Sequence, residues 1–337
     1  MKIVLAEHFG MCFGVRDAIA QAEQLAEQAP LTILGELVHN PVVRERLRAQ
    51  GAREASPDEI DSTHIASSAG DARSRGLPSP QSSQRSTQSR SRGGGREAPG
   101  EGCSAHGSSD QLEAAATTSP RMMITAHGVS DTKRAAWREH GFQVVDGTCP
   151  LVRHAHEQLK RLVAAGHFPI VIGKVGHVEV RGLTEDFPEA RVVDLPSDIL
   201  ELPRRDRYGV ICQTTQPIDR VRALVAEIKC LHPASEVHFV DTVCKPTKDR
   251  QSALQKLIDV AEVIVVVGGH GSNNTRQLVE SCQAAGRRAF HVERPEELRS
   301  EWFDSIGIVG LTAGTSTLRE TVDAVFRRLE EIARTQP

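Results

Sequence analysis

The chain has 337 residues, 41 of them basic and 44 acidic, which gives a formal net charge of −3 at pH 7. A single hydrophobic core rarely grows past roughly 250 to 300 residues, so this length predicts two or three compact units. The balanced charge argues against nucleic acid or an anionic membrane as a partner, and the absence of a long apolar run or a signal-peptide pattern predicts a cytoplasmic chain.

Strand and helix patterns alternate from the N-terminus. A short β-rich run at 3–5 precedes a pattern at about 15–28 whose apolar residues recur at helical spacing. A second strand is predicted at 31–34. A second helix is predicted at 41–50, because Asn40 is a capping residue and the proline after it suits a first helical turn. This βαβα order predicts a parallel sheet.

The pattern stops between residues 62 and 120. The sequence there turns to Ser, Arg, Gly, Gln and Pro, and Leu77 is the one branched aliphatic or aromatic residue between 66 and 110. A segment with so little apolar surface cannot offset the entropy that it would lose on ordering. We therefore predict a disordered insertion in the first unit, and we expect no role for its Cys103 and His106.

The alternation resumes after the insertion and continues to the C-terminus. It predicts an α/β protein in which helices cover both faces of parallel sheets. Strands are expected at 122–124, 142–145, 168–172, 191–193, 208–212, 237–240, 263–267, 288–292 and 307–311, and helices at 131–140, 151–165, 218–231, 247–260, 274–285 and 317–333.

Seven cysteines, an odd number with no signal peptide, argue against a disulfide framework. Cys149 and Cys244 each follow a strand and a Val-Asp pair, and each precedes a helix start that contains Pro. Cys12 follows the first strand by a longer approach. Such positions, where a strand ends and a helix starts, hold the ligands of many α/β sheets, and the helix dipole there favours a thiolate. The remaining cysteines are expected to be non-ligands: Cys103, Cys212, Cys230 and Cys282.

One such cysteine in each third of the chain predicts three similar lobes that direct three thiols to one centre. A free cysteine is most often a small buried hydrophobe, but three in matching contexts favour a shared metal centre. Two kinds of centre remain open: a Cys₃His zinc site, and a cubane iron–sulfur cluster with three protein ligands and one open iron. Zinc ligands usually come in closely spaced pairs, so the long separations favour the cluster.

Polar residues also gather after apolar strands, so we expect them at the same sheet edges as the cysteines. Imidazoles, hydroxyls and amides without a wall of carboxylates suit a diphosphate, and the sequence has no GxxxxGK[ST] loop to support a nucleotide cofactor. Glu179, next but one to His177, is the best candidate proton donor; the alternative is a solvated acid at a strand end. The polar segments are ELVHN 36–40, TAHGV 125–129, GHVEV 176–180, QTT 213–215, GSNNT 271–275 and TAGTS 312–316.

With these segments assembled, the chain resembles the 4-hydroxy-3-methylbut-2-enyl diphosphate reductases of the LytB/IspH family. The match is in order and runs from end to end apart from the insertion. The matching segments are CFGV 12–15, ELVHN 36–40, AHGV 126–129, DGTCPLV 146–152, GHVEV 176–180, QTT 213–215, DTVCKPT 241–247 with RQ 250–251, and TAGTS 312–316.

The resemblance implies three α/β lobes in a pseudo-threefold arrangement around a [4Fe-4S] cluster that Cys12, Cys149 and Cys244 would hold. The allylic hydroxyl of the substrate would bind the open iron, and two electrons with protons would remove it as water. The products would be isopentenyl and dimethylallyl diphosphates, at the last step of the non-mevalonate isoprenoid pathway. A ferredoxin or flavodoxin would supply the electrons.

The resemblance also implies roles for the polar residues. Glu179 would relay the proton, and Thr214 would lie near the substrate hydroxyl or order a water. The chain departs from the family pattern at Val178 and Leu318, where Pro is common, and at Asn273, where an amide that can still donate a hydrogen bond replaces Ser. The diphosphate would be held by His39, His127, His177, Ser272, Asn273, Asn274 and Ser316.

Two other functions fit the same residues. A cluster-dependent hydro-lyase would remove hydroxide without net electron transfer, and a non-catalytic paralogue would keep only the fold. Because the Glu179 carboxylate and all three thiols are present together, a degenerate paralogue is disfavoured. The expected lobes are 13–149, 150–241 and 242–337, the last joined by the N-terminal segment 1–12.

Overall fold

The computed structural model describes residues 1–38, 40–56, 59–60 and 120–335. All of them belong to one compact unit. A second unit, Asp61–Thr118, lies outside the described residues. The predicted disordered insertion at 62–120 therefore also lies outside them, apart from Pro120.

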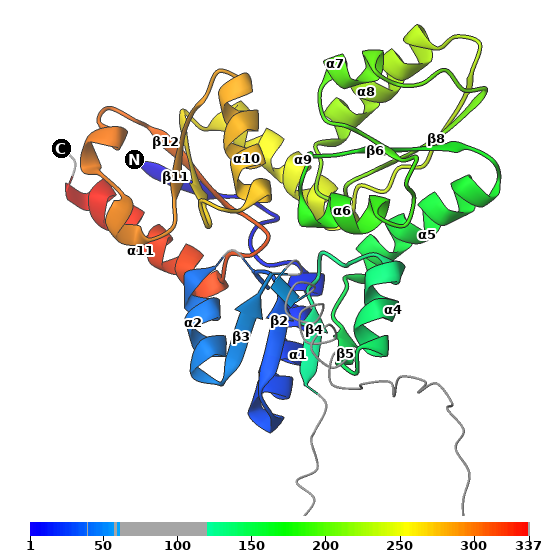
Figure 1. The fold of residues 1–337 in the computed structure, drawn as a ribbon. Helices are drawn as coiled ribbons and strands as arrows, with labels where there is room; N and C mark the ends of the chain where they lie inside the picture. The colour runs from blue at the N-terminus through cyan, green and yellow to red at the C-terminus, as the bar shows by residue number, and fades with distance from the viewer. Residues whose placement is uncertain (39, 57–58, 61–119, 336–337) are drawn as a thin grey trace, which may run out of the picture. The chain divides into compact units, whose positions relative to one another are not determined.

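Three four-stranded parallel sheets form the three lobes (Figure 1). This confirms the predicted α/β class and the three-lobed plan. In strand order, the first sheet is β3 (Ala52–Ala55), β2 (Leu31–Leu34), β4 (Arg121–Ile124) and β5 (Gln143–Asp146); the second is β7 (Arg191–Val193), β6 (Phe168–Ile172), β8 (Arg207–Cys212) and β9 (Glu236–Phe239); the third is β11 (Arg288–Val292), β10 (Val263–Val267), β12 (Ile308–Ala313) and β1 (Lys2–Leu5).

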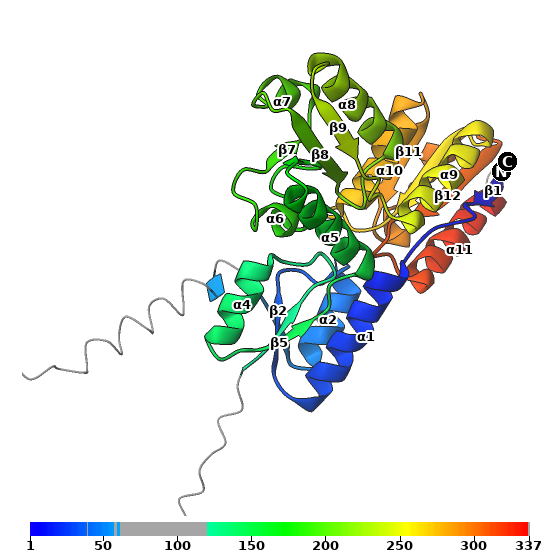
Figure 2. The ribbon, with the colours of Figure 1, turned by 90° about the vertical axis from the view of Figure 1, so that its right-hand side faces the viewer.

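The N-terminal strand belongs to the third sheet. β1 pairs in parallel with β12, and Lys2 lies opposite Ile308. The C-terminal helix α11 (Arg319–Thr335) packs against β1, so the two ends of the chain lie side by side, as Figure 2 shows. This pairing agrees with the expected joining of segment 1–12 to the third lobe, whereas the lobe boundaries themselves stay a prediction.

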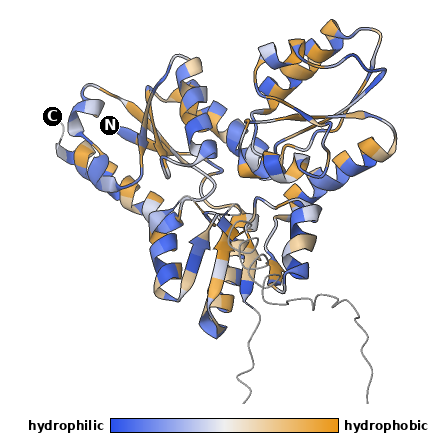
Figure 3. Cartoon of the chain, in the orientation of Figure 1, coloured by the Kyte–Doolittle hydropathy of each residue, from blue (hydrophilic) through white to orange (hydrophobic). Residues whose placement is uncertain are grey.

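Each sheet is buried on both faces, as parallel sheets are. All five residues of β6 and all five of β10 are buried. Along β10, Val263, Val265 and Val267 join one core cluster, and Ile264 and Val266 join the cluster on the opposite face. Figure 3 shows strands that are largely hydrophobic and helices that carry both kinds of residue. The remaining helices are α1 (Phe13–Gln28), α2 (Pro41–Ala49), α4 (Asp131–Glu139), α5 (Pro150–Ala164), α6 (Val178–Thr184), α7 (Pro196–Leu200), α8 (Ile218–Leu231), α9 (Lys245–Val260) and α10 (Asn273–Ala284), with short 3₁₀ turns at Pro295–Glu297 and Ser300–Phe303.

Three helices carry the chain from one lobe to the next. After β1 of the third sheet, α1 packs on β2 of the first sheet. After β5 of the first sheet, α5 packs on β6 and β8 of the second. After β9 of the second sheet, α9 packs on β12 of the third. The helix after each edge strand thus packs on the sheet of the next lobe, and the three connections together run from the third lobe to the first, the second and back to the third. No described helix has the length and apolarity needed to cross a membrane.

Several elements differ from the sequence-based expectation. All of the predicted strands and helices are present, and their ends agree with the prediction to within two residues. The segment 176–180 was predicted as a polar loop, but its second half starts the helix α6. Its seven residues are too few to show a helical repeat of apolar residues. The strand β3 and the helix α7 were also not predicted, and both are short.

Hydrogen bonds join the lobes in pairs. Asn40 Nδ2 in the first lobe donates to the Ser316 carbonyl in the third at 3.1 Å. Gln251 Nε2 on α9 donates to the Gln216 carbonyl in the second lobe at 3.0 Å. Between the first and second lobes, a carboxylate of one lobe accepts hydrogen bonds from the first amides of a helix in the other.

Asp186 in the second lobe caps the helix α4 of the first. Its Oδ2 accepts the Asp131 N–H at 2.7 Å, and its Oδ1 accepts the Thr132 N–H at 3.0 Å and the Thr132 hydroxyl at 2.7 Å. The first amides of a helix lack partners within the helix, so a carboxylate at this end satisfies them and interacts favourably with the helix dipole. Asp186 is therefore a capping residue supplied by a neighbouring lobe.

Replacing Asp186 with Ala is expected to lower the free energy of unfolding at pH 7 by about 1–2 kcal/mol, because two helix-end amides lose their acceptor. Asp186→Asn keeps one acceptor oxygen and should lose less. Urea denaturation measures both, with the exposed Asp304→Ala as the control that should match wild type.

The same cap has a defined pH dependence. Burial tends to raise the pKa of Asp186, but the hydrogen bonds from Thr132 and Asp131 lower that pKa overall. A carboxyl whose pKa is lower in the folded state stabilises fully above its unfolded pKa, and the gain is lost as pH falls through the folded pKa. The difference between wild type and Asp186→Ala should therefore hold from pH 7 to about pH 4 and shrink as the pH falls further; a difference that stays unchanged in acid would contradict this account.

Candidate functional site

The three predicted ligand cysteines occupy the same place in the three lobes. Cys12, Cys149 and Cys244 are the N-cap residues of α1, α5 and α9, the helices that carry the chain from one lobe to the next. Each follows the edge strand of its sheet: β1, β5 or β9. The predicted position beyond a strand and at a helix start is therefore confirmed for all three.

A repeated backbone hydrogen bond fixes each of these cysteines. The Cys12 N–H donates to the Thr315 carbonyl at 3.3 Å, the Cys149 N–H to the Ala126 carbonyl at 3.0 Å, and the Cys244 N–H to the Thr214 carbonyl at 2.9 Å. Each acceptor lies in the loop after the neighbouring inner strand: β12, β4 or β8. One lobe's cysteine and its polar loop are thus held together in the same way three times.

The thiols are electrostatically close to one another and to Glu179. Burial raises the pKa of Cys149, and the charges of Cys12 and Glu179 raise it further, against the amides of Leu151 and Val152. Burial likewise raises the pKa of Cys244, again with contributions from Cys12 and Glu179. The helix-start amides act in the direction expected from the sequence, but desolvation outweighs them and raises the pKa of both thiols.

Two residues near the cysteines were not singled out from the sequence. Gly14 packs so closely on Cys149 that a Cβ atom at position 14 would lie 2.6 Å from Cys149 Sγ. Arg250 is buried, donates to the Gly10 and Pro246 carbonyls, and has an Nε without a hydrogen-bond partner. Burial lowers the pKa of Arg250, and the charges of Cys12 and Cys244 counter this. The Arg-Gln pair at 250–251 was part of the recognised pattern, but the sequence did not reveal that it faces two thiols.

Most of the predicted substrate residues line one cavity. It contains six of them, from all three lobes, together with the predicted proton donor Glu179, whereas Thr214 is not part of its lining. Apolar side chains complete the lining, and sequence reasoning did not select them because they look like ordinary core residues. His39 is not among the described residues, although its neighbour Val38 lines the cavity. The cavity is lined by Val15, Leu37, Val38, Ala126, His127, His177, Glu179, Thr215, Ser272, Asn273, Asn274, Thr315 and Ser316.

The two described histidines of the cavity lie against each other. The ring centroids of His127 and His177 are 5.6 Å apart in an edge-to-face arrangement. His177 is the N-cap of α6, and its Nδ1 accepts the Glu179 N–H at 3.1 Å. A neutral imidazole that accepts at Nδ1 carries its proton on Nε2, so His177 can donate to a ligand from that nitrogen.

A third group of polar residues surrounds the start of α10. Ser272 is the N-cap and accepts the Thr275 N–H at 3.3 Å, and Asn274 Oδ1 accepts the Thr315 N–H at 3.1 Å. Asn273 Nδ2 is buried and has no hydrogen-bond partner among the described residues. A buried donor without a partner is costly, and the positive end of a helix dipole attracts anions. This end of the cavity therefore suits a negatively charged group with several acceptor oxygens.

Glu179 lies between the histidines and the cysteine loops and is only 2% exposed. Its Oε1 accepts the Thr214 N–H at 2.6 Å. Burial raises the pKa of Glu179 to about 7, although the backbone and hydroxyl of Thr214 act in the opposite direction. The alternative of a solvated acid at a strand end is wrong, because the residue is buried and lies in α6. Thr214 itself contacts Glu179 and, through its carbonyl, Cys244.

Six described cysteines are free, including all three N-cap cysteines. Within the described residues, three other groups have ligand atoms that all lie within 4.8 Å of one another, as a single metal ion requires; the N-cap cysteines do not form such a group. Those groups are His167 with Glu236 and His238, Asp131 with His156 and Asp186, and His270 with Glu293 and Glu297.

We expect Glu179 to titrate near neutral pH. Between its ordinary pKa of 4.5 and about 7, the folded chain keeps a proton that the unfolded chain has released, so this residue makes the chain less stable as pH rises through that window. Infrared spectra should show a protonated-carboxyl band that fades through about pH 7. The band should be missing in Glu179→Gln and kept in the control Glu189→Gln, which is exposed. Loss of the Glu179 carboxyl band already at pH 5 would contradict a pKa near 7 for this residue.

Comparison with known proteins places the chain in a family. The family model described as "LytB protein" matches residues 3–84 and 100–330. The chain is 29% identical to the 4-hydroxy-3-methylbut-2-enyl diphosphate reductase of Aquifex aeolicus, with 100% of this chain and 98% of that protein covered. It is 30% identical to the reductase of the same name from Geobacter sulfurreducens, with 98% of each chain covered.

Two solved structures have a similar fold. One is the E-1-hydroxy-2-methyl-but-2-enyl-4-diphosphate reductase of Plasmodium falciparum, with a TM-score of 0.75, 21% identity, and 97% of this chain and 87% of that chain covered. The other is an (E)-4-hydroxy-3-methyl-but-2-enyl diphosphate reductase, described as the terminal enzyme of the non-mevalonate pathway, with a TM-score of 0.58, 28% identity, and 98% and 99% covered. Since the family model spans most of the sequence, the chain belongs to the LytB protein family.

Proposed function

We propose that the chain reduces (E)-4-hydroxy-3-methylbut-2-enyl diphosphate to isopentenyl and dimethylallyl diphosphates, with loss of the hydroxyl as water. The observation that carries this proposal is Glu179, a buried acid with a pKa near 7 that borders both the polar cavity and the cysteines. The names of the curated relatives support the same reaction. A hydro-lyase would need the same open iron but no electron donor, and no feature of the described residues favours it.

We further propose that Cys12, Cys149 and Cys244 hold a [4Fe-4S] cluster. The charge of Cys12 acts on both other N-cap thiols, so the three are close enough to interact electrostatically. They lie too far apart to surround a single ion, and a cluster therefore fits them better than a zinc ion does. Gly14 leaves room beside Cys149, and the buried Arg250 offsets the negative charge of thiolates. When bound, the cluster would supply the electrons and an iron site not occupied by a protein ligand.

The polar end of the cavity would bind the diphosphate. His177 offers Nε2–H, Asn273 offers a buried amide without a partner, and Ser272 and Asn274 surround the start of α10. His127 and Ser316 line the same cavity. Neutral donors and a helix dipole suit an anion in a site from which water is largely excluded. His39 keeps its proposed part in this set.

The remaining side chains would position the five-carbon part of the substrate and deliver the proton. Val15, Leu37 and Val38 give the cavity an apolar side, which matches a hydrocarbon chain. Glu179, half protonated near neutral pH, is poised to give up its proton, and Thr214 holds its carboxyl group in place. A ferredoxin or flavodoxin would supply the electrons, and the free cysteines fit a reducing cytoplasm.

The cysteine assignment predicts three equivalent losses. After anaerobic purification, the wild-type chain should hold about four iron and four sulfide per chain. Cys12→Ser, Cys149→Ser and Cys244→Ser should each lose most of both, and also the reduction of the allylic diphosphate by a chemical electron donor. Cys230→Ser, an exposed cysteine on α8, is the control and should equal wild type. Iron retained in any of the three variants, or zinc in wild type, would contradict the ligand set.

The proton role of Glu179 predicts a separable defect. Glu179→Gln should keep its iron and sulfide and its binding of the allylic diphosphate, but lose turnover by roughly 10²-fold or more, since a neutral amide cannot supply the proton. Glu189→Gln serves again as the exposed control. Turnover equal to wild type in Glu179→Gln would remove this residue from the proton path.

A further inference from the structure

A second group of metal-type ligands lies in the second lobe. His167, Glu236 and His238 have ligand atoms that all fall within 4.8 Å of one another. None of the three lines the cavity described above. They are therefore a separate feature of the chain, independent of the proposed reaction.

The fold brings these residues together across a strand. His167 directly precedes β6, Glu236 and His238 belong to β9, and β8 runs between the two strands. Gly209 on β8 lies opposite His238, and a Cβ atom at position 209 would come within 2.9 Å of His167 Cβ. The missing side chain leaves room for the His167 ring above β8, so that the ring centroids of His167 and His238 lie 5.5 Å apart.

The neutral ring of His167 is held in the tautomer that suits a metal ligand. Its side chain is 4% exposed, and its Nδ1 lies 3.2 Å from the Leu162 carbonyl, which can only accept. The Nδ1 atom must therefore carry the proton, which leaves the lone pair of the neutral ring on Nε2. A backbone carbonyl on the opposite ring nitrogen is the usual support of a histidine that binds a metal.

The Nε2 atom of His167 is buried, and no described residue forms a hydrogen bond with it. It faces Glu236 Oε1 at 3.7 Å, which is too long for a hydrogen bond. When the ring is neutral, the lone pair on Nε2 faces a carboxylate oxygen, and either a proton or a metal ion between the two atoms relieves the repulsion. This distance is compatible with two ligands of one ion, each about 2.0–2.2 Å from it.

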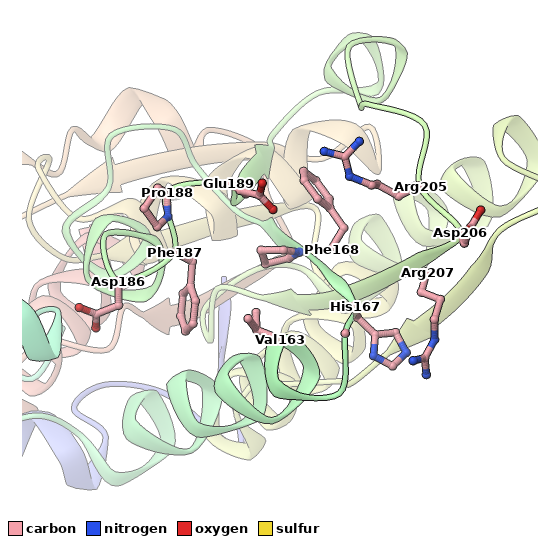
Figure 4. Close-up of a pocket in the computed structure, with 12 residues that line it drawn as sticks. Val163, His167, Phe168, Asp186, Phe187, Pro188, Glu189, Arg205, Asp206 and Arg207 are labelled. Atoms are coloured by element: carbon pink, nitrogen blue, oxygen red, sulfur yellow. The ribbon is translucent and has the colours of Figure 1, made fainter.

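Arg207 orients the carboxylate of Glu236 and favours its ionised form. Its Nε donates to Oε2 at 2.9 Å, and its Nη1 donates to the Ala165 carbonyl at 2.7 Å. This contact leaves Oε1 available, and the hydrogen bond and charge of Arg207 lower the pKa of Glu236, so the group is ionised at neutral pH. Figure 4 shows His167 and Arg207 side by side at one end of an open surface pocket.

We propose that His167, Glu236 and His238 form a binding site for a divalent transition-metal ion of the zinc type. Two imidazoles and one carboxylate are a common ligand set for Zn²⁺ and leave a fourth position for water or another ligand. Glu236 and His238 are exposed, so an ion can enter from solvent. A bound ion would link the start of β6 to β9 across β8 and satisfy the buried Nε2.

Zinc titration of the cluster-loaded protein tests this site. Isothermal calorimetry under anaerobic conditions, with the cluster absorbance followed to show that the cluster stays intact, should reveal one tight zinc site per chain in wild type. His238→Ala and Glu236→Gln should each weaken that site at least tenfold. His154→Ala, an exposed histidine on α5 of the same lobe, should bind zinc as wild type does.

A second measurement separates metal binding from a structural effect. Zinc should raise the melting temperature of wild type and of His154→Ala but not that of His238→Ala, while all three should melt alike without zinc. The proposal is overturned if wild type binds no zinc, or if His238→Ala binds it with unchanged affinity. Either result would leave His167 as the imidazolium partner of Glu236 instead.

Discussion

The structure depends on one backbone hydrogen bond that is made three times. In each lobe, the N–H of an N-cap cysteine donates to the carbonyl of the loop that follows the neighbouring inner strand. The cysteine lies at the end of the loop that follows an edge strand, and it is the N-cap of the helix that packs on the next sheet. A single contact thereby fixes a thiol, a polar loop and the passage between two lobes. Because the backbone makes this bond, a substitution of the cysteine side chain by any residue except proline removes the thiol and keeps the bond.

Desolvation is the second physical constraint, and it acts on four titratable groups at or near the thiols. Burial raises the pKa of Cys149, Cys244 and Glu179, and it lowers that of Arg250. Without a cofactor, the site therefore favours neutral groups over charged ones, in spite of three helix N-termini. A metal cofactor that binds thiolates would reverse this balance at the cysteines.

Features that repeat along the chain were predicted from the sequence, whereas features that occur once were not. Strand and helix alternation predicted the α/β class, and the matching contexts of Cys12, Cys149 and Cys244 predicted three lobes and the shared position of these cysteines, because both signals recur along the chain. The helix α6 was missed because seven residues cannot display a helical repeat, and this hid the burial of Glu179. Arg250 and the apolar lining of the cavity were missed for another reason: their partners come from other lobes, and no local pattern encodes such contacts.

The central claim is that three N-cap cysteines, and no fourth protein ligand, hold a four-iron cluster. Mössbauer spectroscopy of ⁵⁷Fe-labelled, anaerobically purified protein tests it most directly. One iron in such a cluster lacks a thiolate and should give a signal distinct from the other three, in an intensity ratio of about one to three. Four equivalent irons, a two-iron spectrum, or protein that contains zinc and no iron would contradict the account.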